Sequence, residues 1–517
     1  MKNSKLVHHF LEDSALRLPD KKALFINGEW YSYAQIEKSA NQLARFFLEC
    51  DVKRGDRVAF YLDNSFEYVA TYYAVLKAGA ITVALNTELT AENLLYILRD
   101  CQVNILVSQQ KLFRKLKPLL DTDILKHFAL WADPRKVRVH SKSAKVHFLP
   151  RESDYFSEAS PQIKIIDLDV ASIVYTSGST GQPRGATLSH LNIVTNTRSI
   201  VDYLEISEND RIMVILPFYY IYGKSLLNTH FFTGGSVVID NRFLYPNVVL
   251  QTMREQQVTG FSGVPSTFSI LLNRSNLRAM QFKDLRYVTQ AGGAMAPAMQ
   301  KEVAKIFAPA KTFIMYGATE ASARLSYLPP EDLSRKWGSI GKGIPNVDLF
   351  IADAHGNELP AGEQGQIAAR GSNIMQGYWN HPEETRKVLK HGLYYTGDLG
   401  VMDDEGFLYV VGRSKDMIKI GGNRASAKEI EEALYEHPLV ADAAVIAVQD
   451  EILGEAPKAF LVLKKSQQVN TAEEAIKNFL KDKLAAYKIP KYFEFRDSLP
   501  KNKSGKIQKL KLAEKGA

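Results

Sequence analysis

The segment from Val174 to His190 constrains the fold of this chain more than any other part of the sequence. It reads VYTSGSTGQPRGATLSH, where small and hydroxyl-bearing residues fill almost every position up to Gln182 and Arg184 follows two positions later. Glycines let backbone N–H groups turn toward one point, hydroxyls add donors, and a cation strengthens such an anion-binding nest. β-branched and aromatic residues on either side predict two strands that hold a short loop. The sequence therefore favours a polyphosphate site over a flexible Ser/Gly linker.

The loop lacks the G-x-x-x-x-G-K-[ST] spacing of a Walker A motif, so it belongs to another class of phosphate site. Arginine after the loop supplies a planar fork of donors that suits a phosphate. We expect the phosphate-binding residues to be Thr176, Ser177, Gly178, Ser179, Thr180, Gly181 and Arg184.

Length and composition predict a soluble protein of more than one domain. A chain of 517 residues exceeds what one compact core usually holds. No apolar run reaches the roughly 18 residues that span a bilayer, and Met1 to Asp20 does not resemble a signal peptide. Cys50 and Cys101 stand apart and predict neither a metal cluster nor a disulfide framework, which fits a cytoplasmic protein.

The charge balance is basic, with 65 Lys and Arg against 57 Asp and Glu. Such an excess suits nucleic acid, anionic lipid, an anionic small molecule or an acidic carrier protein. The basic residues gather in the segments 111–117, 135–145 and 481–511. None of these has the aromatic interleaving of a single-strand binder or a zinc-finger pattern, so we expect no nucleic-acid partner.

Three blocks of different character precede the C-terminal tail. Residues 1 to about 165 alternate helical patterns with short apolar strands. Between 166 and 330 the alternation continues, which predicts a parallel sheet covered by helices. Residues 338–412 carry many glycines and turn dipeptides between short strands, which predicts a small β-barrel-like subdomain.

The tail after Gly412 predicts a compact α+β unit. Ser426 to Glu429 and Thr471 to Glu474 both have the pattern of a capping box, and the second is expected to open a helix through about Ala486. Three short apolar runs predict strands at residues 443–448, 459–463 and 492–495.

The Val174–His190 segment resembles the phosphate loop of the adenylate-forming superfamily, which includes acyl-CoA synthetases, adenylation domains of peptide synthetases and firefly luciferase. The usual form in that family is Y-T-S-G-[ST]-T-G-x-P-K-G, and here Arg184 replaces the lysine but keeps its charge. The segment WYSYAQIEKSANQLARFFLECDVKRGDRVAFYL and the later LKAGA also resemble the opening of this family. The resemblance covers nearly the whole chain.

Two further motifs resemble the family's nucleotide site. Ala291-Gly292-Gly293-Ala294 resembles the small-residue turn on which adenine lies, since a flat ring needs a surface without side chains. Tyr316-Gly317-Ala318-Thr319-Glu320 resembles the family's Y-G-x-T-E. This resemblance implies that Tyr316 stacks on adenine, that Thr319 donates to the α-phosphate, and that Glu320 supplies a carboxylate for Mg²⁺.

The ribose site and the hinge follow. Tyr394 to Asp398 resembles Y-x-T-G-D and implies that Asp398 accepts the ribose hydroxyls. The run GRSKDMIK from Gly412 resembles the family's hinge, in which Arg413 would reach the ribose or the α-phosphate. Lys415 and Asp416 would be the pivot of a mobile tail.

Two lysines would serve the two half-reactions of the family. Pro500 to Ile507 resembles P-x-T-x-x-G-K-[ILV] with Asn502 in place of Thr, so Lys506 would bridge the carboxylate nucleophile and the α-phosphate. After the tail rotates, Lys419 would approach the active site beside Gly421 and Gly422, whose bare backbone leaves room for a pantetheine arm.

The acyl pocket is expected near LPFYYIYG, which resembles L-P-x-F-H-x-x-G with Tyr220 at the histidine position. No nearby Asp could hold an α-ammonium group, so an amino-acid substrate is disfavoured. Lys224 suits either an acidic tail on the substrate or, as we favour, a snorkelling surface position. The expected pocket residues are Tyr220, Ile221, Gly223, Gly292 and Gly317.

The resemblance implies an α/β fold with an N-terminal adenylation domain over residues 1–414. This domain would contain two layered α/β subdomains and the β-barrel-like subdomain at about 335–414. Residues 415–517 would form the small mobile α+β domain.

The activity implied is ATP-dependent activation of a carboxylic acid as acyl-AMP, with Mg²⁺, followed by transfer to coenzyme A. A fatty acid is the first expectation and an aryl acid the second. CoA is favoured because no fused carrier segment is visible, and a carrier-protein phosphopantetheine is the alternative. A luciferase-like oxidase would share the first half-reaction. A non-catalytic nucleotide-binding regulator is opposed by the retained Glu320, Asp398 and Lys506.

Overall fold

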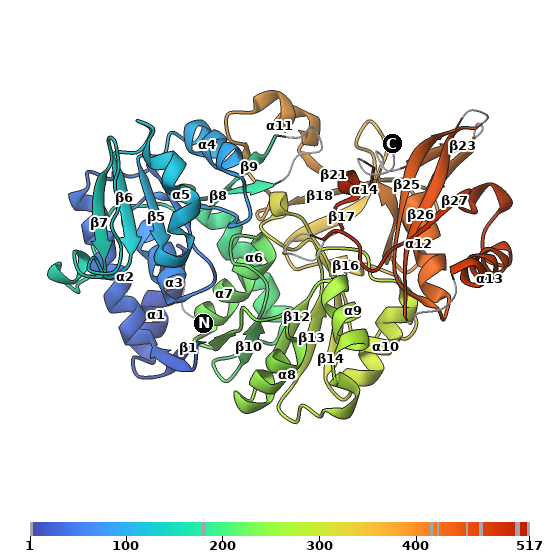
Figure 1. The fold of residues 1–517 in the computed structure, drawn as a ribbon, viewed down its shortest axis with the longest axis horizontal. Coiled ribbons are helices and arrows are strands. Elements are labelled where there is room, and N and C mark those ends of the chain that lie inside the picture. The colour runs from blue at the N-terminus through green and yellow to red at the C-terminus, as the bar shows by residue number, and fades with distance from the viewer. Residues whose placement is uncertain are drawn as a thin grey trace.

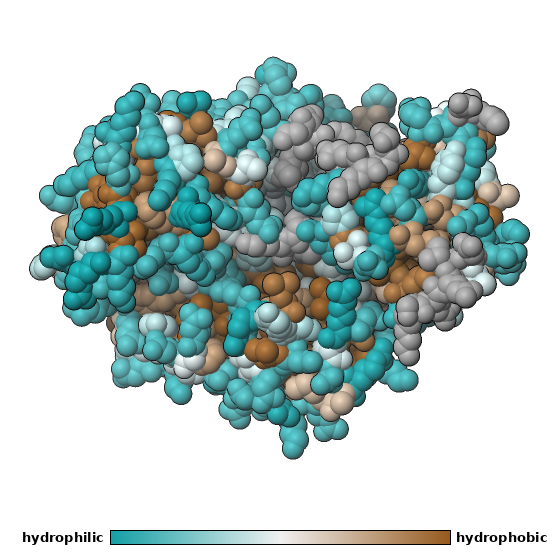
Figure 2. All heavy atoms as spheres, in the orientation of Figure 1, coloured by the Kyte–Doolittle hydropathy of each residue, from teal (hydrophilic) through white to brown (hydrophobic). Residues whose placement is uncertain are grey.

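The computed structural model describes residues 4–176, 182–413, 417–420, 423–450, 453–464, 469–501 and 507–513. A large N-terminal part, blue to yellow, carries a smaller, mostly red C-terminal part at one side (Figure 1). The expected α/β class with a large N-terminal and a small C-terminal domain is confirmed. Among the described residues, every helix falls short of the length and apolar character needed to cross a bilayer. The face in Figure 2 is mostly hydrophilic, with apolar residues in separate groups.

An eight-stranded sheet carries the hairpin that frames the predicted phosphate loop. The strands from β8 to β7 run parallel, while β9 and β19 join antiparallel at one edge. In spatial order the strands are β19 (Gly377–Tyr378), β9 (Arg184–Ser189), β8 (Val170–Thr176), β4 (Ile81–Ala84), β3 (Arg57–Tyr61), β5 (Ile105–Gln109), β6 (His127–Trp131) and β7 (Lys145–Leu149). The helices between them are α2 (Tyr33–Glu49), α3 (Phe66–Lys77), α4 (Ala91–Asp100) and α5 (Phe113–Leu120).

A nine-stranded sheet forms the second layer, and its central strands β11 to β14 are parallel. In spatial order the strands are β16 (Lys342–Gly343), β15 (Ser326–Leu328), β14 (Lys311–Tyr316), β13 (Tyr287–Gln290), β12 (Gly260–Gly263), β10 (Arg211–Val214), β11 (Ser236–Ile239), β1 (Lys22–Ile26) and β2 (Glu29–Ser32). Its helices are α6 (His190–Leu204), α7 (Ile221–Thr233), α8 (Pro246–Glu255), α9 (Pro265–Arg274) and α10 (Pro297–Phe307), with α1 (His9–Arg17) against α7. The N-terminal hairpin β1–β2 therefore extends this sheet rather than the first one.

One apolar core joins the two sheets. It includes Phe60 on β3, Tyr68 and Tyr72 on α3, Val214 on β10 and Phe231 on α7, all essentially without exposure to solvent. Helices α3, α6 and α7 lie between the sheets in Figure 1. This shared core fixes the relative position of the two layers, so strand ends from both layers can build one site.

The next segment forms a five-stranded antiparallel sheet. It contains β17 (Val347–Ala352), β18 (Gly365–Gly371), β20 (Leu389–Lys390), β21 (Leu393–Met402) and β22 (Leu408–Arg413), with α11 (Pro382–Val388) beside it. Its last pair, β21 and β22, places Asp398 opposite Arg413.

The C-terminal unit is a second five-stranded sheet with helices. Its elements are β23 (Met417–Ile420), β24 (Asn423–Ser426), α12 (Ala427–Glu436), β25 (Val440–Asp450), β26 (Gly454–Leu463), α13 (Val469–Lys481), β27 (Tyr492–Phe495) and α14 (Lys509–Ala513). As predicted, Ser426 caps α12 by accepting the N–H of Glu429. The same hydroxyl donates to the Val411 carbonyl at 2.6 Å, which docks this unit onto β22.

The prediction for α13 was wrong at both ends. The helix begins at Val469, so Thr471 lies inside its first turn, and it ends at Lys481 rather than near Ala486. Leu480 is buried in the core of the unit, and Leu484 and Ile489 pack against that same core. The chain therefore turns back toward the core after Lys481, which tertiary packing enforces and a local capping pattern cannot reveal.

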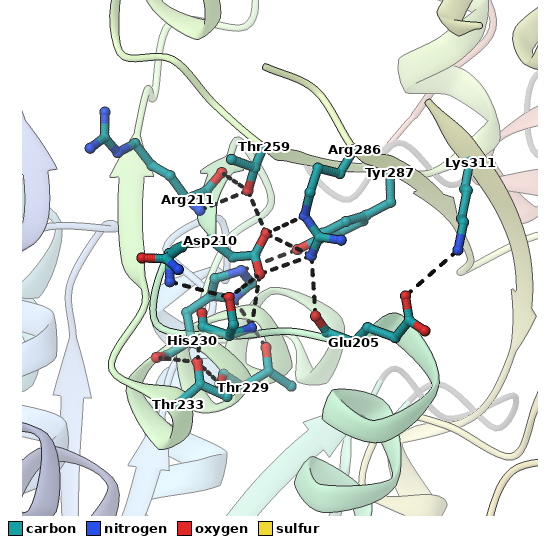
Figure 3. Close-up of polar contacts among 12 residues, drawn as sticks. Glu205, Asp210, Arg211, Thr229, His230, Thr233, Thr259, Arg286, Tyr287 and Lys311 are labelled. Carbon is teal, nitrogen blue, oxygen red and sulfur yellow. Dashed lines mark hydrogen bonds and ion pairs between the residues drawn. The ribbon is translucent and has the colours of Figure 1, made fainter. Parts of the chain in front are cut away.

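Asp210 anchors the amino-terminal ends of three neighbouring strands (Figure 3). Its carboxylate accepts two N–H groups of Arg286 at 2.9 and 2.8 Å and the Thr259 hydroxyl at 2.8 Å. Asp210, Thr259 and Arg286 each precede a strand: β10, β12 and β13. Burial opposes ionisation, but the N–H of Ser207 and the side chains of Arg286 and Thr259 hold the pKa of Asp210 below its ordinary value.

Removing the Asp210 carboxylate should destabilise the fold. Asp210→Ala is expected to cost about 2–3 kcal/mol, less than a fully buried pair, because Arg286 is partly exposed and can regain water. The control is Arg370→Ala, whose ion pair with Asp348 is well exposed on both sides, with an expected change within about 0.5 kcal/mol. Urea unfolding at neutral pH measures both changes, and equal midpoints would contradict this account.

Candidate active site

Strands β8 and β9 form the predicted hairpin around the phosphate loop. Their register pairs Thr176 with Arg184, so the two chain segments enter and leave the loop side by side. The predictions for Ser177, Gly178, Ser179, Thr180 and Gly181 lie outside the described residues. Both flanking residues, Thr176 and Arg184, are half-buried.

Arg184 is held by a carboxylate from another part of the chain. Its Nη1 lies 2.7 Å from the Glu384 carboxylate of α11, and its guanidinium stands 5.9 Å from the ring of Tyr378. Tyr378 lies on β19, which pairs with β9 beside Arg184. The cation at the end of the loop is thus positioned by residues about two hundred positions later in the chain.

Glu320 is oriented by the same tyrosine. The Tyr378 hydroxyl donates to one Glu320 oxygen at 2.6 Å. Burial, and then the charge of Glu320, raise the pKa of Tyr378, so the hydroxyl stays protonated as a donor. The donor set fits Mg²⁺, since a carboxylate is a hard oxygen ligand and Tyr378 fixes its orientation. Glu320 and Arg184 therefore belong to one cluster.

Asp398, Tyr316 and Arg413 form a second cluster. The Tyr316 hydroxyl donates to one Asp398 oxygen at 2.6 Å, and Arg413 Nε donates to the other at 2.9 Å. Asp398 is buried, and each of its oxygens retains acceptor capacity beyond these bonds. Burial and the Asp398 charge raise the pKa of Tyr316 well above its ordinary value. The arrangement can accept hydroxyl donors such as those of a cis-diol.

The glycines of the predicted site serve different structural purposes. A side chain at Gly317 would place Cβ 1.9 Å from the Ala323 carbonyl oxygen, and one at Gly223 would place it 2.3 Å from that of Pro217. These two glycines allow backbone segments to approach closely. Gly292, by contrast, is exposed, with φ of +82°.

The Gly292–Ala294 turn presents bare backbone after β13. Gly292, Gly293 and Ala294 are exposed, and Gln290 donates to the Gly293 carbonyl at 2.7 Å to hold the turn. A Cβ at Gly292 would lie 4.0 Å from Tyr222, which links this surface to α7. The turn is therefore adjacent to the aromatic segment expected to line the acyl pocket.

The aromatic segment packs against a buried cation that the motif did not predict. Tyr220 and Ile221 are half-buried at the start of α7. Tyr222 is buried, and the guanidinium carbon of Arg324 stands 4.3 Å from the centre of its ring. Arg324 is 2% exposed, and no carboxylate among the described residues lies within ion-pair distance of it.

Lys224 is a correction to the sequence interpretation, because it is buried rather than on the surface. Its side chain has no exposure, and its Nζ donates to the Ser172 hydroxyl of β8 at 3.2 Å and lies 5.5 Å from the ring of Tyr72. Burial lowers the pKa of Lys224 to about 7. The packing of α7 between the two sheets removed this lysine from water, which its local sequence could not show.

The residues expected to act from the C-terminal tail are only partly described. Lys419 lies exposed on β23, and its N–H donates to Glu455 of the same unit at 2.8 Å, so the structure does not join it to the Asp398 cluster. Lys415, Asp416 and Lys506 lie outside the described residues. Thr319 is half-buried beside Glu320.

Sequence reasoning missed three residues of the site: Tyr378, Glu384 and Arg324. Each acts through a contact with a residue far away in sequence or on another element, and none stands in a motif that we singled out. A charged residue four positions after Glu320 was the only available sign of Arg324.

Comparison with known proteins agrees with this geometry. Residues 11–379 match the family of AMP-binding enzymes, and residues 429–506 match the AMP-binding enzyme C-terminal domain. A long-chain-fatty-acid–CoA ligase of Bacillus subtilis is 34% identical over 99% of this chain and 94% of its own length. Feruloyl-CoA synthase of Amycolatopsis sp is 32% identical over 95% of each protein. The crystal structure of the anthranilate CoA ligase AuaEII with anthranoyl-AMP superposes with a TM-score of 0.91, at 26% identity, over 100% of this chain and 99% of that one.

The chain therefore belongs to the family of AMP-binding enzymes. Within that family it is of the acyl-CoA synthetase type, and the resemblance found in its motifs is confirmed.

Replacing Lys224 with methionine should stabilise the enzyme in a pH-dependent way. In the folded chain the Lys224 amine is protonated only below about pH 7, whereas in the unfolded chain it is protonated up to about pH 10.5. The free energy by which Lys224 destabilises the fold therefore decreases as the pH rises from about 7 to about 10.5. Lys224→Met, of similar volume, is expected to gain up to roughly 4 kcal/mol at pH 6.5 and much less near pH 10.

Urea midpoints at pH 6.5, 8 and 9.5 measure this difference. The control Lys53→Met replaces an exposed lysine and should show no such trend. A gain that stays constant with pH would contradict the assignment of a neutral amine.

Proposed function

We propose that this enzyme activates a carboxylic acid with ATP and Mg²⁺ as acyl-AMP and transfers the acyl group to coenzyme A. The observation that carries the proposal is the Tyr316–Asp398–Arg413 cluster beside the Arg184–Tyr378–Glu320 cluster. One offers a buried carboxylate for ribose, and the other pairs a cation with a hard oxygen ligand for a metal polyphosphate. The two free cysteines suit the reducing cytoplasm, where we place the enzyme.

In the first step, a carboxylate oxygen forms a bond to the α-phosphorus, and the bond from the α-phosphorus to the β-phosphate bridging oxygen breaks. Pyrophosphate leaves with the bonding pair. Arg184 and the loop residues hold the departing phosphates, while Asp398 and Thr319 hold the ribose and the α-phosphate. Lys506 neutralises charge on the reacting phosphorus. Mg²⁺ at Glu320 would share the phosphate charge.

In the second step, the thiol sulfur forms a bond to the acyl carbonyl carbon, and the bond from that carbon to the phosphate oxygen of AMP breaks. AMP leaves with the bonding pair, and the thiol proton is released to solvent. We assign Lys415 and Asp416 as the pivot that replaces Lys506 by Lys419, Gly421 and Gly422 at the active site. Ser426, which belongs to the tail, donates its hydroxyl to the Val411 carbonyl of β22. The tail is thus attached to the strand that lies just before this pivot in the chain. The C-terminal unit thus presents Lys506 to the active site in the first half-reaction and Lys419 in the second.

The two-lysine assignment separates the half-reactions. Lys506→Ala should lower acid-dependent ATP–pyrophosphate exchange by roughly 10²–10³-fold, because it removes a preorganised charge at the reacting phosphorus. Lys419→Ala should keep exchange and lose thioester formation. Lys511→Ala, an exposed lysine of the same basic tail, is the matched control.

Pyrophosphate exchange and CoA thioester yield are measured on the same preparations. Near-normal exchange in Lys506→Ala would overturn its role, and equal loss of both activities in Lys419→Ala would overturn the division. Thioester formation with a carrier protein but not with CoA would favour the alternative acceptor.

A fatty acid is the first substrate class, supported by the relative named a long-chain-fatty-acid–CoA ligase. An aryl acid is the second, and a specific observation favours it. Arg324 is buried against Tyr222, and its described donors reach the Met315 sulfur, the Ala323 carbonyl and the Tyr203 hydroxyl. A guanidinium has five N–H donors and sulfur is a weak acceptor, so donor capacity is left for a polar ring substituent.

Arg324→Leu tests the two substrate classes. With aryl acids that carry a carboxylate or carbonyl substituent, kcat/KM for adenylation should fall about 10–100-fold, because a hydrogen bond to a charged donor is lost. Saturated fatty acids should change little. Arg370→Leu, an exposed arginine, is the control, and a thermal midpoint checks folding. An equal fall for both acid classes would assign Arg324 to structure alone.

A further inference from the structure

Three donor side chains meet on the eight-stranded sheet, at the edge away from the phosphate loop. They are Cys50, His127 and His147, whose potential ligand atoms all lie within 4.8 Å of one another. Strands β6 and β7 form this edge, whereas β9 and β19 form the opposite one, so the cluster is separate from the nucleotide site (Figure 1). The proposed reaction gives no role to any of these residues.

Strand register places the two histidines on one face of the sheet. His147 on β7 is paired with Ala129 on β6, and His127 lies two residues before Ala129. Side chains two positions apart in a strand share a face, so His127 lies diagonally next to His147.

Helix α2 covers that same face and delivers the cysteine. The Phe46 ring packs edge-to-face on His147 with centroids 5.0 Å apart. Cys50 caps the C-terminus of α2 and follows Phe46 by four residues, which puts the thiol on the same side of the helix. A hollow of about 320 Å³ is lined by these residues together with Glu49 and Lys145.

The polar contacts fix which ring nitrogens face each other. The Glu152 carboxylate lies 2.7 Å from His147 Nδ1, and its other oxygen accepts the N–H of Phe148 at 2.9 Å. His147 Nδ1 is thus the donor to Glu152, which makes His147 Nε2 the acceptor for the N–H of His127 Nδ1, 3.1 Å away. A metal ion between the two nitrogens would take the place of that proton, with His127 carrying its proton on Nε2 instead. A carboxylate that orients a buried histidine in this way is the usual support of a metal-binding imidazole.

The separation of the donors suits a small tetrahedral ion. Zinc–nitrogen bonds of about 2.0–2.1 Å imply that two ligand nitrogens lie roughly 3.3 Å apart. The distance from His127 Nδ1 to His147 Nε2 is 3.1 Å, close to that value. The thiol lies within 4.8 Å of both nitrogens, so it has to move by no more than about 1 Å, which a half-buried residue at a helix end can do. One thiolate and two neutral imidazoles form a donor set that favours Zn²⁺ over Mg²⁺ or Ca²⁺.

We propose that Cys50, His127 and His147 bind one Zn²⁺, with water as the fourth ligand and Glu152 as the outer support of His147. Binding releases the Cys50 thiol proton to solvent. The ion ties the end of α2 to the β6–β7 pair, whose two strands are already joined by their backbone ladder. Its effect is on stability, and the adenylation chemistry does not pass through it.

Cobalt substitution tests the site directly. The full-length enzyme is stripped of metal with a chelator and titrated with Co²⁺ in the absence of ATP. One equivalent should give a thiolate-to-cobalt charge-transfer band together with tetrahedral visible bands, and Zn²⁺ should displace both. Because the chain has only two cysteines, the thiolate band must come from Cys50 or Cys101.

Variants of those two cysteines decide between them. Cys50→Ser should abolish the thiolate band and the rise in unfolding midpoint with Zn²⁺, which otherwise follows from binding to the folded state alone. Cys101→Ala should keep both, since that thiol is buried beside Tyr175 on another part of the sheet. His147→Gln should weaken binding at least tenfold.

Adenylation activity should be unchanged in Cys50→Ser. A wild-type protein without the thiolate band, or a Cys50→Ser variant that binds Zn²⁺ equally well, would overturn the proposal. Glu152, His147 and His127 would then form a hydrogen-bonded chain and no metal site. Loss of the zinc site leaves the proposed ligase activity untouched, so the two ideas fail separately.

Discussion

The carboxylate of Asp398, held between the Tyr316 hydroxyl and the Arg413 guanidinium, connects the parts of the molecule that adenylation requires. Tyr316 ends strand β14 of the nine-stranded sheet. Asp398 and Arg413 face each other on β21 and β22 of the five-stranded sheet that precedes the C-terminal unit. A buried carboxylate is tolerated only while its hydrogen bonds are made, so these partners hold the two sheets in one relative position. Arg413 is also the last described residue before the proposed pivot. Its hydrogen bond to Asp398, the residue that we assign to the ribose, therefore fixes the strand end from which the C-terminal unit would rotate.

The phosphate side depends on a similar connection. Tyr378 reaches Glu320 with its hydroxyl and presents its ring to Arg184, because β19 adds to the free edge of β9. A strand of only two residues thus brings a late segment of the chain to a loop near residue 180. Gly317 completes the arrangement, since only a residue without Cβ lets this backbone pass so close to Ala323. The site consequently forms only after both sheets and the β19 connection are in place.

The sequence predicted what local patterns encode and failed where burial or distant contacts decide. The β8–β9 hairpin, the Ser426 cap and the alternation of strands and helices all follow from neighbouring residues, and the structure confirms them. Lys224 was misplaced because its burial depends on α7 lying between two sheets, which no window around it shows. The Cys50 cluster was missed for a related reason. Its three donors stand far apart in the chain, with none of the close spacing that marks a zinc motif, and only strand register brings the histidines together.

Two buried cations flank the aromatic wall of the proposed acyl pocket, and they differ in how their burial can be tolerated. Lys224 is two residues from Tyr222 on α7, and it can lose its proton, which removes most of the cost of burial. Arg324 stands against the ring of Tyr222 and keeps its charge at any physiological pH. The Tyr222 ring face and the Met315 sulfur are weak partners of that charge, while the Ala323 carbonyl accepts one of its N–H groups. The guanidinium therefore keeps donor capacity beside the proposed acyl pocket, which is the basis of the aryl-acid class that we propose as the second substrate class.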